Sequence, residues 1–261
     1  MALKTDASHA ESHRYYEEFS FAVGMRDWLQ PNLRHEQLRL LIEDVVTGRG
    51  LSLLDVGCGA GVMTSFLTRF GQVTGIDFSA KAIDAARRIV SDVNFHAGTV
   101  DVLPPEARFD VITLFDVLEH IRAEDRPGLL GDLRGRLTED GVLFISTPHP
   151  RFTGARRAAC DETLQIVDEE VELHDVLREA RDVGLGLTRY QVYDVFAGSP
   201  EYQMMVFTPD RVVGGPPSKV DPRLRYPGRR RWRIANAART VRHNPRVARW
   251  FLTGRPPTIR S

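Results

Sequence analysis

The sequence LLDVGCGAG, residues 53–61, joins an apolar run to three glycines at every second position. The apolar residues 51–56 predict a buried parallel strand, and the apolar periodicity of residues 62–70 predicts a helix after the glycines. Strand, turn and helix in this order direct backbone N–H groups at the helix N-terminus toward a ligand. Glycine suits such a turn because the backbone can bend sharply and approach the ligand without a Cβ in the way.

The glycine spacing helps to decide which ligand the turn binds. A dinucleotide fingerprint would need its third glycine at position 62, where this chain has Val62. The next predicted strand, residues 72–77, ends in Asp77, and an acid at that place can accept hydrogen bonds from ribose hydroxyls. The pattern favours a nucleoside ligand. A dehydrogenase is the alternative from another enzyme class, and the missing glycine disfavours it.

Four motifs resemble those of the class I S-adenosylmethionine-dependent methyltransferases. LLDVGCGAG resembles the first motif of that family, and GIDFS at 75–79 resembles its second-strand acid. FDVITLFDVLEHI at 109–121 resembles the fourth-strand motif, and DGVLFISTP at 140–148 resembles the fifth strand. Four motifs in the right order are far more specific than one. Within the class, the ubiquinone-biosynthesis O-methyltransferases look nearest.

The resemblance implies an α/β fold with a doubly wound, Rossmann-like, seven-stranded and mostly parallel sheet whose last strand is antiparallel. We expect three parts: an N-terminal helical cap at 1–50, a methyltransferase domain at 51–210, and a linker with a basic amphipathic helical extension at 211–261. Residue patterns predict further helices at 33–46, 80–90, 127–137 and 169–183, strands at 93–97, 109–115, 141–147, 187–196 and 202–207, and a substrate-side loop at 152–166.

The resemblance also implies S-adenosylmethionine as the cofactor. Phe78 is expected to lie against the adenine. Thr99 stands where the commonest family pattern has an Asp, so backbone groups of Thr99 and Val100 are expected to contact the adenine, with Asp101 as a further candidate. The expected cofactor-binding residues are Asp55, Gly57, Cys58, Gly59, Gly61, Asp77, Phe78, Thr99, Val100, Phe115 and Arg34.

Arg34 belongs to this set because the N-terminal helices of the resembled family lie over the cofactor and part of the substrate pocket. Its guanidinium, or that of Arg39, could meet the methionine carboxylate of the cofactor. The alternative is that both arginines are solvated residues of a helix.

Methyl transfer to a hydroxyl needs a group that removes the acceptor's proton. His149, bracketed by two prolines, and His120 are the candidates, because an imidazole titrates near neutral pH. Asp116 is expected to steer the methionine amino group. If this turn is helical, Asp116, Glu119 and His120 share one face and could instead hold a divalent metal. Many class I enzymes carry a Leu-Glu-His here without a metal, so we expect none.

We therefore expect an enzyme that methylates a hydroxyl of a small molecule of phenolic or glycan type. The alternatives are an N- or C-methyltransferase acting on a small molecule or a protein, and a non-catalytic scaffold that binds the cofactor. Methyltransferases of base amines often carry Asn/Asp-Pro-Pro-Tyr/Phe after the fourth strand. This chain has Phe115-Asp116-Val117-Leu118 there, which disfavours a nucleic-acid substrate.

The formal net charge of zero conceals a strong asymmetry. Residues 219–261 hold 13 of the 35 Lys and Arg residues but one of the 35 acids, which leaves 22 basic and 34 acidic residues in 1–218. The basic tail favours contact with the acidic body or peripheral contact with an anionic membrane surface. An anionic partner, RNA and a partly ordered, solvated tail are the alternatives. The two cysteines and the polar N-terminus indicate a reducing compartment without a secretory signal, so we expect a cytoplasmic protein.

Overall fold

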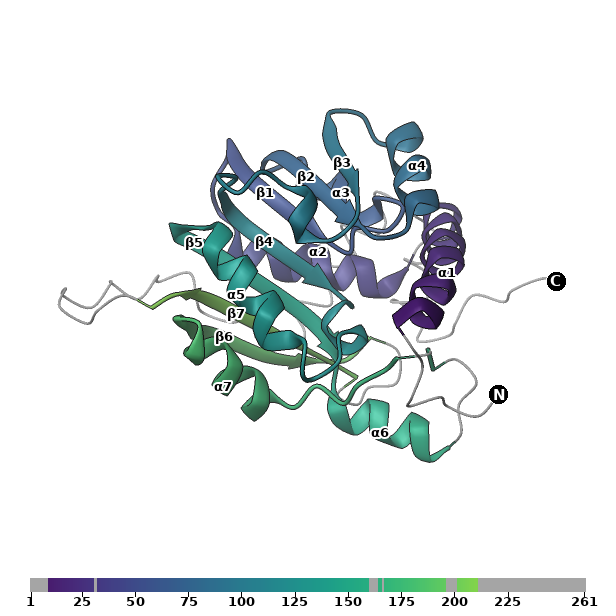
Figure 1. Ribbon diagram of the computed structural model, residues 1–261, viewed down its shortest axis with the longest axis vertical. Coiled ribbons are helices and arrows are strands. Elements are labelled where there is room, and N and C mark those ends of the chain that lie inside the picture. Colours follow the sequence, from purple (N-terminus) through teal and green to yellow (C-terminus); the bar gives the residue numbers. More distant parts are fainter. Residues whose placement is uncertain (1–8, 31, 160–163, 166, 196–200, 211–261) are drawn as a thin grey trace, which may run out of the picture. The chain divides into compact units, whose positions relative to one another are not determined.

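The computed structural model describes residues 9–30, 32–159, 164–165, 167–195 and 201–210 (Figure 1). The predicted linker and basic extension at 211–261 lie outside these residues, and so does the membrane contact expected of them. Among the described helices, none combines the length and the apolar character that crossing a membrane requires.

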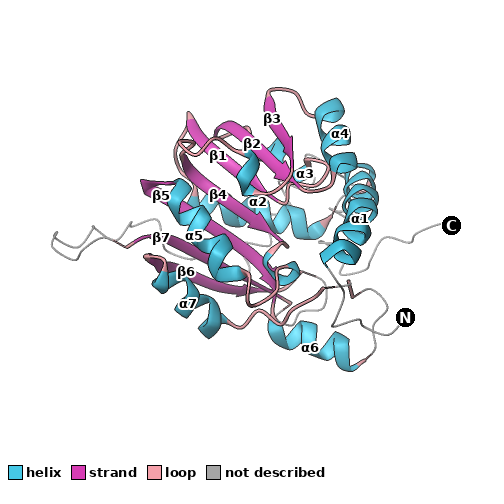
Figure 2. Ribbon diagram, viewed as in Figure 1, coloured by secondary structure: helices cyan, strands magenta, loops and turns pink. Residues whose placement is uncertain are grey.

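The described residues form a seven-stranded sheet with the order β3-β2-β1-β4-β5-β7-β6 (Figure 2). Strands β1 to β5 pair in parallel, whereas β7 pairs antiparallel with both β5 and β6. This confirms the predicted fold class. The strands are β1 Leu51–Val56, β2 Gly71–Asp77, β3 Val93–Ala97, β4 Phe109–Phe115, β5 Leu137–Pro148, β6 Leu185–Tyr193 and β7 Tyr202–Pro209.

Helices cover both faces of the sheet. Successive strand residues point to opposite faces, so Leu54 packs with the apolar cluster of α5 and α7, while Leu53 packs with that of α2 and α3. The helices are α1 His9–Leu29, α2 Leu33–Val45, α3 Val62–Leu67, α4 Ala80–Ile89, α5 Arg126–Arg136, α6 Pro150–Ala158 and α7 Leu173–Asp182. Two short 3₁₀ turns, η1 Val100–Val102 and η2 Leu118–His120, follow β3 and β4.

The prediction of a loop at 152–166 was wrong over its first half, because residues 150–158 form α6. Pro150 occupies the first turn of this helix, where a missing N–H costs nothing, and His149 caps the helix by accepting from the N–H of Arg151. The two prolines around His149 therefore mark the start of a helix.

Several other boundaries differ from the prediction, and two of them differ by four residues. The expected helix at 169–183 begins at Leu173, because the preceding residues run extended: Glu169 N–H donates to the Glu119 carbonyl at 2.8 Å. Strand β5 begins at Leu137 instead of residue 141, and an irregularity in its pairing with β4 between Phe109 and Val111 accommodates the extra residues.

Candidate active site

The glycine turn lies at the carboxyl end of β1, toward which α1 and α6 also lie (Figure 1). The N–H groups of Gly57 and Cys58 both donate to the carbonyl of Ile76, at 2.8 and 3.0 Å, and so tie the turn to β2. Gly57 has a φ of +70°, and a Cβ on it would lie 2.4 Å from Val117 Cγ2. This close approach brings the turns after β1 and β4 together at one site.

Asp77 connects the tip of β2 to the glycine turn. Its Oδ2 accepts from the N–H of Gly59 at 2.9 Å, and its Oδ1 accepts from the N–H of Ser79 at 2.8 Å. Burial raises the pKa of Asp77, although these two hydrogen bonds oppose the shift. Ser79 caps α4, because its side chain accepts from the N–H of Ala82. The structure thus brings Gly59 and Asp77 together, as expected of a ribose site.

The carboxylate of Asp55 lies beneath the glycine turn, and Cys58 is partly buried in the turn itself. The Asp55 carboxylate is 1% exposed and accepts from the hydroxyls of Thr64 at 2.6 Å and Thr113 at 2.8 Å. Burial raises its pKa to about 6. Burial also raises the pKa of the Cys58 thiol, which packs in the small cluster that contains Phe95. In this structure Asp55 braces β1 against α3 and β4, and its carboxylate does not reach the surface of the turn.

The residues expected near the adenine lie on the loops after β2 and β3. Phe78 is half-buried directly after Asp77. Thr99 is exposed, and its hydroxyl donates to Asp101 at 3.2 Å, while Val100 is buried at the start of η1. Phe115, at the end of β4, makes an edge contact with Phe144, with ring centroids 5.7 Å apart.

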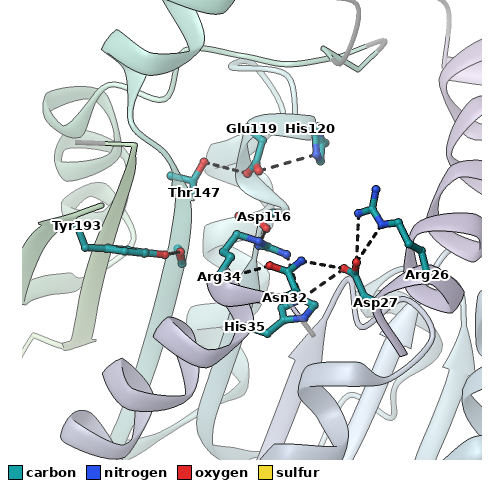
Figure 3. A network of polar contacts seen from close by, with 11 residues as sticks. Arg26, Asp27, Asn32, Arg34, His35, Asp116, Glu119, His120, Thr147 and Tyr193 are labelled. Carbon is teal, nitrogen blue, oxygen red and sulfur yellow. Dashed lines mark hydrogen bonds and ion pairs between the residues drawn. The ribbon is translucent and has the colours of Figure 1, made fainter. Parts of the chain in front are cut away.

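Arg34 and Asp116 form an ion pair between α2 and the end of β4 (Figure 3). The side chains are 15% and 21% exposed, so the pair is largely withdrawn from water. Asp116 has a φ of +54°, an uncommon conformation for a residue with a side chain. Arg39 instead pairs with Glu36 at 2.5 Å and lies over the ring of Phe66. Of the two predicted arginines, Arg34 is the one that reaches the residues at the strand ends.

The helical face that the alternative metal site would require is not formed after β4. Asp116 precedes the 3₁₀ turn η2 and points to Arg34, whereas Glu119 points to Thr147 on β5 (Figure 3). Over the part of the chain that the structure describes, no three His, Cys, Asp or Glu side chains gather as metal ligands would. The alternative metal set of Asp116, Glu119 and His120 is therefore not assembled.

Glu119 and His120 form a dyad beside β5. Glu119 is 1% exposed, and its Oε2 accepts from the Thr147 hydroxyl at 2.9 Å. Burial raises the pKa of Glu119, and the charge of His120 acts in the opposite direction. His120 Nδ1 lies 2.7 Å from the carbonyl of Val167, so the neutral ring carries its proton on Nδ1 and its lone pair on Nε2, 3.9 Å from Glu119 Oε1.

His149 has a different arrangement. Its Nδ1 accepts from the N–H of Arg151 at 3.3 Å, so the proton of the neutral ring lies on Nε2. Burial, and secondarily the charge of Arg151, lower the pKa of His149. The ring thus caps a helix, and the lone pair that a base would use is engaged.

Sequence reasoning missed the aromatic residues that β6 and β7 bring to the site. Tyr193 shares a 2.6 Å hydrogen bond with the hydroxyl of Ser146 (Figure 3). Tyr202 stacks on Tyr193 with ring centroids 5.6 Å apart, and Arg34 lies 5.9 Å over the Tyr202 ring. No local motif marks these tyrosines, because only the pairing of β5 with β7 and of β7 with β6 brings them beside Ser146.

Helix α1 contacts the glycine turn and the N-terminus of α4 directly. Trp28 Nε1 donates to the carbonyl of Ala60 in the glycine turn at 2.8 Å. The Glu17 carboxylate accepts from the N–H groups of Ala80 and Lys81 at 3.2 and 3.1 Å, at the N-terminus of α4. The N-terminal helices therefore lie against the elements that were expected to bind the cofactor.

Comparison with known proteins identifies a family. A model described as "Methyltransferase domain" matches residues 25–197, more than half of the chain. A ubiquinone biosynthesis O-methyltransferase from Coxiella burnetii (strain RSA 493 / Nine Mile phase I) is 31% identical over 140 residues, which cover 49% of this chain and 59% of the relative. One from Rhodopseudomonas palustris (strain BisB5) is 36% identical over 103 residues, covering 38% and 40%. The match spans about six tenths or less of these relatives.

Solved structures share the fold. A TehB-like SAM-dependent methyltransferase from Corynebacterium glutamicum aligns over 78% of this chain and 100% of its own, with a TM-score of 0.54 and 21% identity. Magnesium protoporphyrin IX methyltransferase from Synechocystis, with bound SAH, aligns over 77% and 100%, with a TM-score of 0.58 and 15% identity. At these identities the likeness concerns the fold.

Proposed function

The chain belongs to the class I S-adenosylmethionine-dependent methyltransferases, and we propose that it methylates a hydroxyl of a small-molecule acceptor of phenolic or glycan type. One observation carries the proposal. The glycine turn, Asp77 and the Arg34–Asp116 pair meet at the carboxyl ends of β1, β2 and β4, the place where open α/β sheets bind their ligands. The O-methyltransferase names of the curated relatives support the choice of a hydroxyl.

The residues present fit the cofactor. Asp77 lies beside the turn, and each of its carboxylate oxygens keeps lone-pair capacity for a ribose hydroxyl. At the other end, Asp116 Oδ1 is buried and has no hydrogen-bond partner among the described residues, which suits the ammonium group of a methionine. Arg34 supplies a cation for its carboxylate. Phe78, Thr99 and Val100 lie on the loops where the adenine would be held.

When bound, S-adenosylmethionine supplies a methyl group already activated on a sulfonium. The work of the protein is therefore to hold the acceptor opposite the carbon–sulfur bond and to remove the proton of its hydroxyl. We assign the base to His120, because its Nδ1 proton is committed to Val167 and its Nε2 lone pair lies on the side of Glu119. A carboxylate there stabilises the imidazolium that forms when Nε2 takes up the proton.

His149 is the less suitable base, because its Nδ1 is engaged in capping α6. Glu119 itself is braced by Thr147 and fully buried, which suits a supporting role better than direct contact with an acceptor. A base of this kind is needed for a hydroxyl acceptor, whereas an amine is already nucleophilic. The dyad thus favours O-methylation over N-methylation.

A turnover assay with isotope-labelled cofactor tests the proposal. The acceptor panel should hold catechols, other phenols and glycosides beside primary amines. We expect transfer to a hydroxyl compound, and we expect His120→Asn to lower kcat by about 10²–10⁴-fold while the affinity for S-adenosylhomocysteine is unchanged. Asn keeps an N–H for Val167 but has no counterpart of Nε2. His149→Asn is the matched control and should retain most turnover.

Transfer to amines alone, with His120→Asn fully active, would assign the chain to the N-methyltransferases. Cofactor binding without transfer to any acceptor in a host extract would favour the scaffold alternative.

A further inference from the structure

We infer that His35 is a positioning residue of this site, whose ring holds the guanidinium of Arg34 in the orientation that receives the methionine carboxylate of the cofactor. This inference rests on the proposed function. It concerns a residue that lies outside the sequence motifs from which that function was inferred. His35 lies in the first turns of α2 and does not itself face Asp116 (Figure 3).

The contacts of Arg34 divide its guanidinium into an anchored side and a presented side. Arg34 Nη2 lies 3.1 Å from His35 Nε2, while Nη1 pairs with Asp116 Oδ2. The carbon of the guanidinium lies 5.9 Å from the centre of the Tyr202 ring. Because the guanidinium is planar and rigid, fixing Nη2 and one face also fixes the direction of Nη1.

His35 can hold Arg34 only as a neutral acceptor, since an imidazolium has no lone pair to offer. The side chain is 7% exposed. Burial first, and then the charges of Arg34, Arg39 and Arg26, lower the pKa of His35 to about 2. The ring is therefore neutral at any working pH, and Nε2 can accept the N–H of Arg34.

The junction between α1 and α2 fixes the backbone that carries both residues. Asn32 Oδ1 accepts from the N–H of Arg34 at 3.0 Å, and Asn32 Nδ2 donates to Asp27 Oδ2 at 3.2 Å. Arg26 Nε in turn donates to Asp27 Oδ1 at 3.1 Å. The same Asp27 Oδ2 lies 3.8 Å from His35 Nε2. This chain of polar contacts joins the end of α1 to the first turn of α2, which carries Arg34 (Figure 3).

The competing interpretation is that His35 merely fills the core beside Leu38. The two interpretations differ in what they predict for ligands that lack the amino acid part of the cofactor. S-adenosylhomocysteine carries the methionine-derived carboxylate, whereas 5′-methylthioadenosine keeps the nucleoside and the thioether but has no carboxylate. Loss of packing would weaken both ligands, and loss of Arg34 orientation would weaken only the first.

The experiment is calorimetry of both ligands with the full chain and three variants. His35→Leu removes the acceptor and keeps an apolar filling, and His35→Gln offers an amide oxygen in its place. His174→Leu, on an exposed side chain of α7, is the matched control. We expect His35→Leu to weaken S-adenosylhomocysteine by about tenfold, with 5′-methylthioadenosine unchanged, and His35→Gln to recover most of the loss. The control should bind both ligands as the unmodified chain does.

Equal weakening of both ligands by His35→Leu, or an unchanged affinity for S-adenosylhomocysteine, would overturn the inference. Retained binding of 5′-methylthioadenosine also reports that a variant is folded, and His35→Asn, whose amide is too short to reach Arg34, replaces the leucine variant if that one does not fold. Failure of the proposed function is distinguishable: a chain that does not use this cofactor would bind neither ligand, and a chain that methylates no hydroxyl would show this in the turnover assay while still binding both ligands.

Discussion

Replacing Asp55 by Asn should make this protein's stability less dependent on pH. The carboxylate is 1% exposed between β1, α3 and β4, and it is braced by two threonine hydroxyls. Asn has nearly the same shape: its oxygen can accept from one hydroxyl, and its NH₂ can donate to the other. The substitution thus preserves the packing and removes the charge.

The magnitude follows from the pKa of Asp55, which burial raises from 3.8 to about 6. Between these values the unfolded chain has released the proton that the folded chain still holds. The free energy of unfolding therefore falls as the pH rises through this window: the contribution is complete below about pH 4 and lost above about pH 6. A shift of about two pKa units corresponds to about 3 kcal/mol.

Urea denaturation, followed by circular dichroism at intervals from pH 4 to 7.5, measures this effect. The stability of the unmodified chain minus that of Asp55→Asn should fall by about 3 kcal/mol across the window. Asp132→Asn, at an exposed position of α5, is the matched control, and its curve should run parallel to that of the unmodified chain. Parallel curves for Asp55→Asn would refute the reasoning that a costly buried carboxylate braces the glycine turn.

Three further substitutions test packing contacts by urea denaturation, one at the amino end of β2 and two beside the site. Gly71→Ala should destabilise the fold by at least about 3 kcal/mol, since its Cβ would lie 1.9 Å from the backbone oxygen of Leu51; a smaller loss would contradict this strand contact. Trp28→Phe removes the hydrogen bond to the Ala60 carbonyl and should cost about 1 kcal/mol. Tyr193→Phe leaves the buried hydroxyl of Ser146 without its hydrogen bond and should lower the free energy of unfolding by about 1–2 kcal/mol. An unchanged urea midpoint for Trp28→Phe or for Tyr193→Phe would contradict a stabilising role for the hydrogen bond that the variant removes.

The parts of the fold that sequence predicted well are those encoded locally. Strands β3 and β4 have the predicted boundaries, because each is a short run of apolar and β-branched residues. The glycine turn and Asp77 could likewise be found from spacing alone. Helix α6 was not predicted, although Pro150 suits the first turn of a helix, where a missing N–H costs nothing.

The candidate site was less predictable where it depends on tertiary contacts. The left-handed backbone of Asp116 turns its carboxylate to Arg34 and away from the face of Glu119, and nothing in the local sequence requires that conformation. The pKa of His35 is set first by burial, which only the folded chain provides, and then by the charges of Arg34 and Arg39 on its own helix and of Arg26 on α1. Tyr193 reaches Ser146 from a strand 47 positions later in the chain.

The most direct test of the central claim is calorimetric titration of S-adenosylhomocysteine into the purified chain and into Asp77→Ala. The Asp77 carboxylate accepts hydrogen bonds from two backbone N–H groups, and we propose that it also binds the ribose hydroxyls. Hydrogen bonds to a charged group contribute about 1.5–3 kcal/mol each. We predict measurable binding by the unmodified chain and a loss of about a hundredfold or more in Asp77→Ala, with the affinity of Asp132→Ala, at an exposed position of α5, unchanged. No binding by the unmodified chain, or equal affinity for Asp77→Ala, would contradict the account.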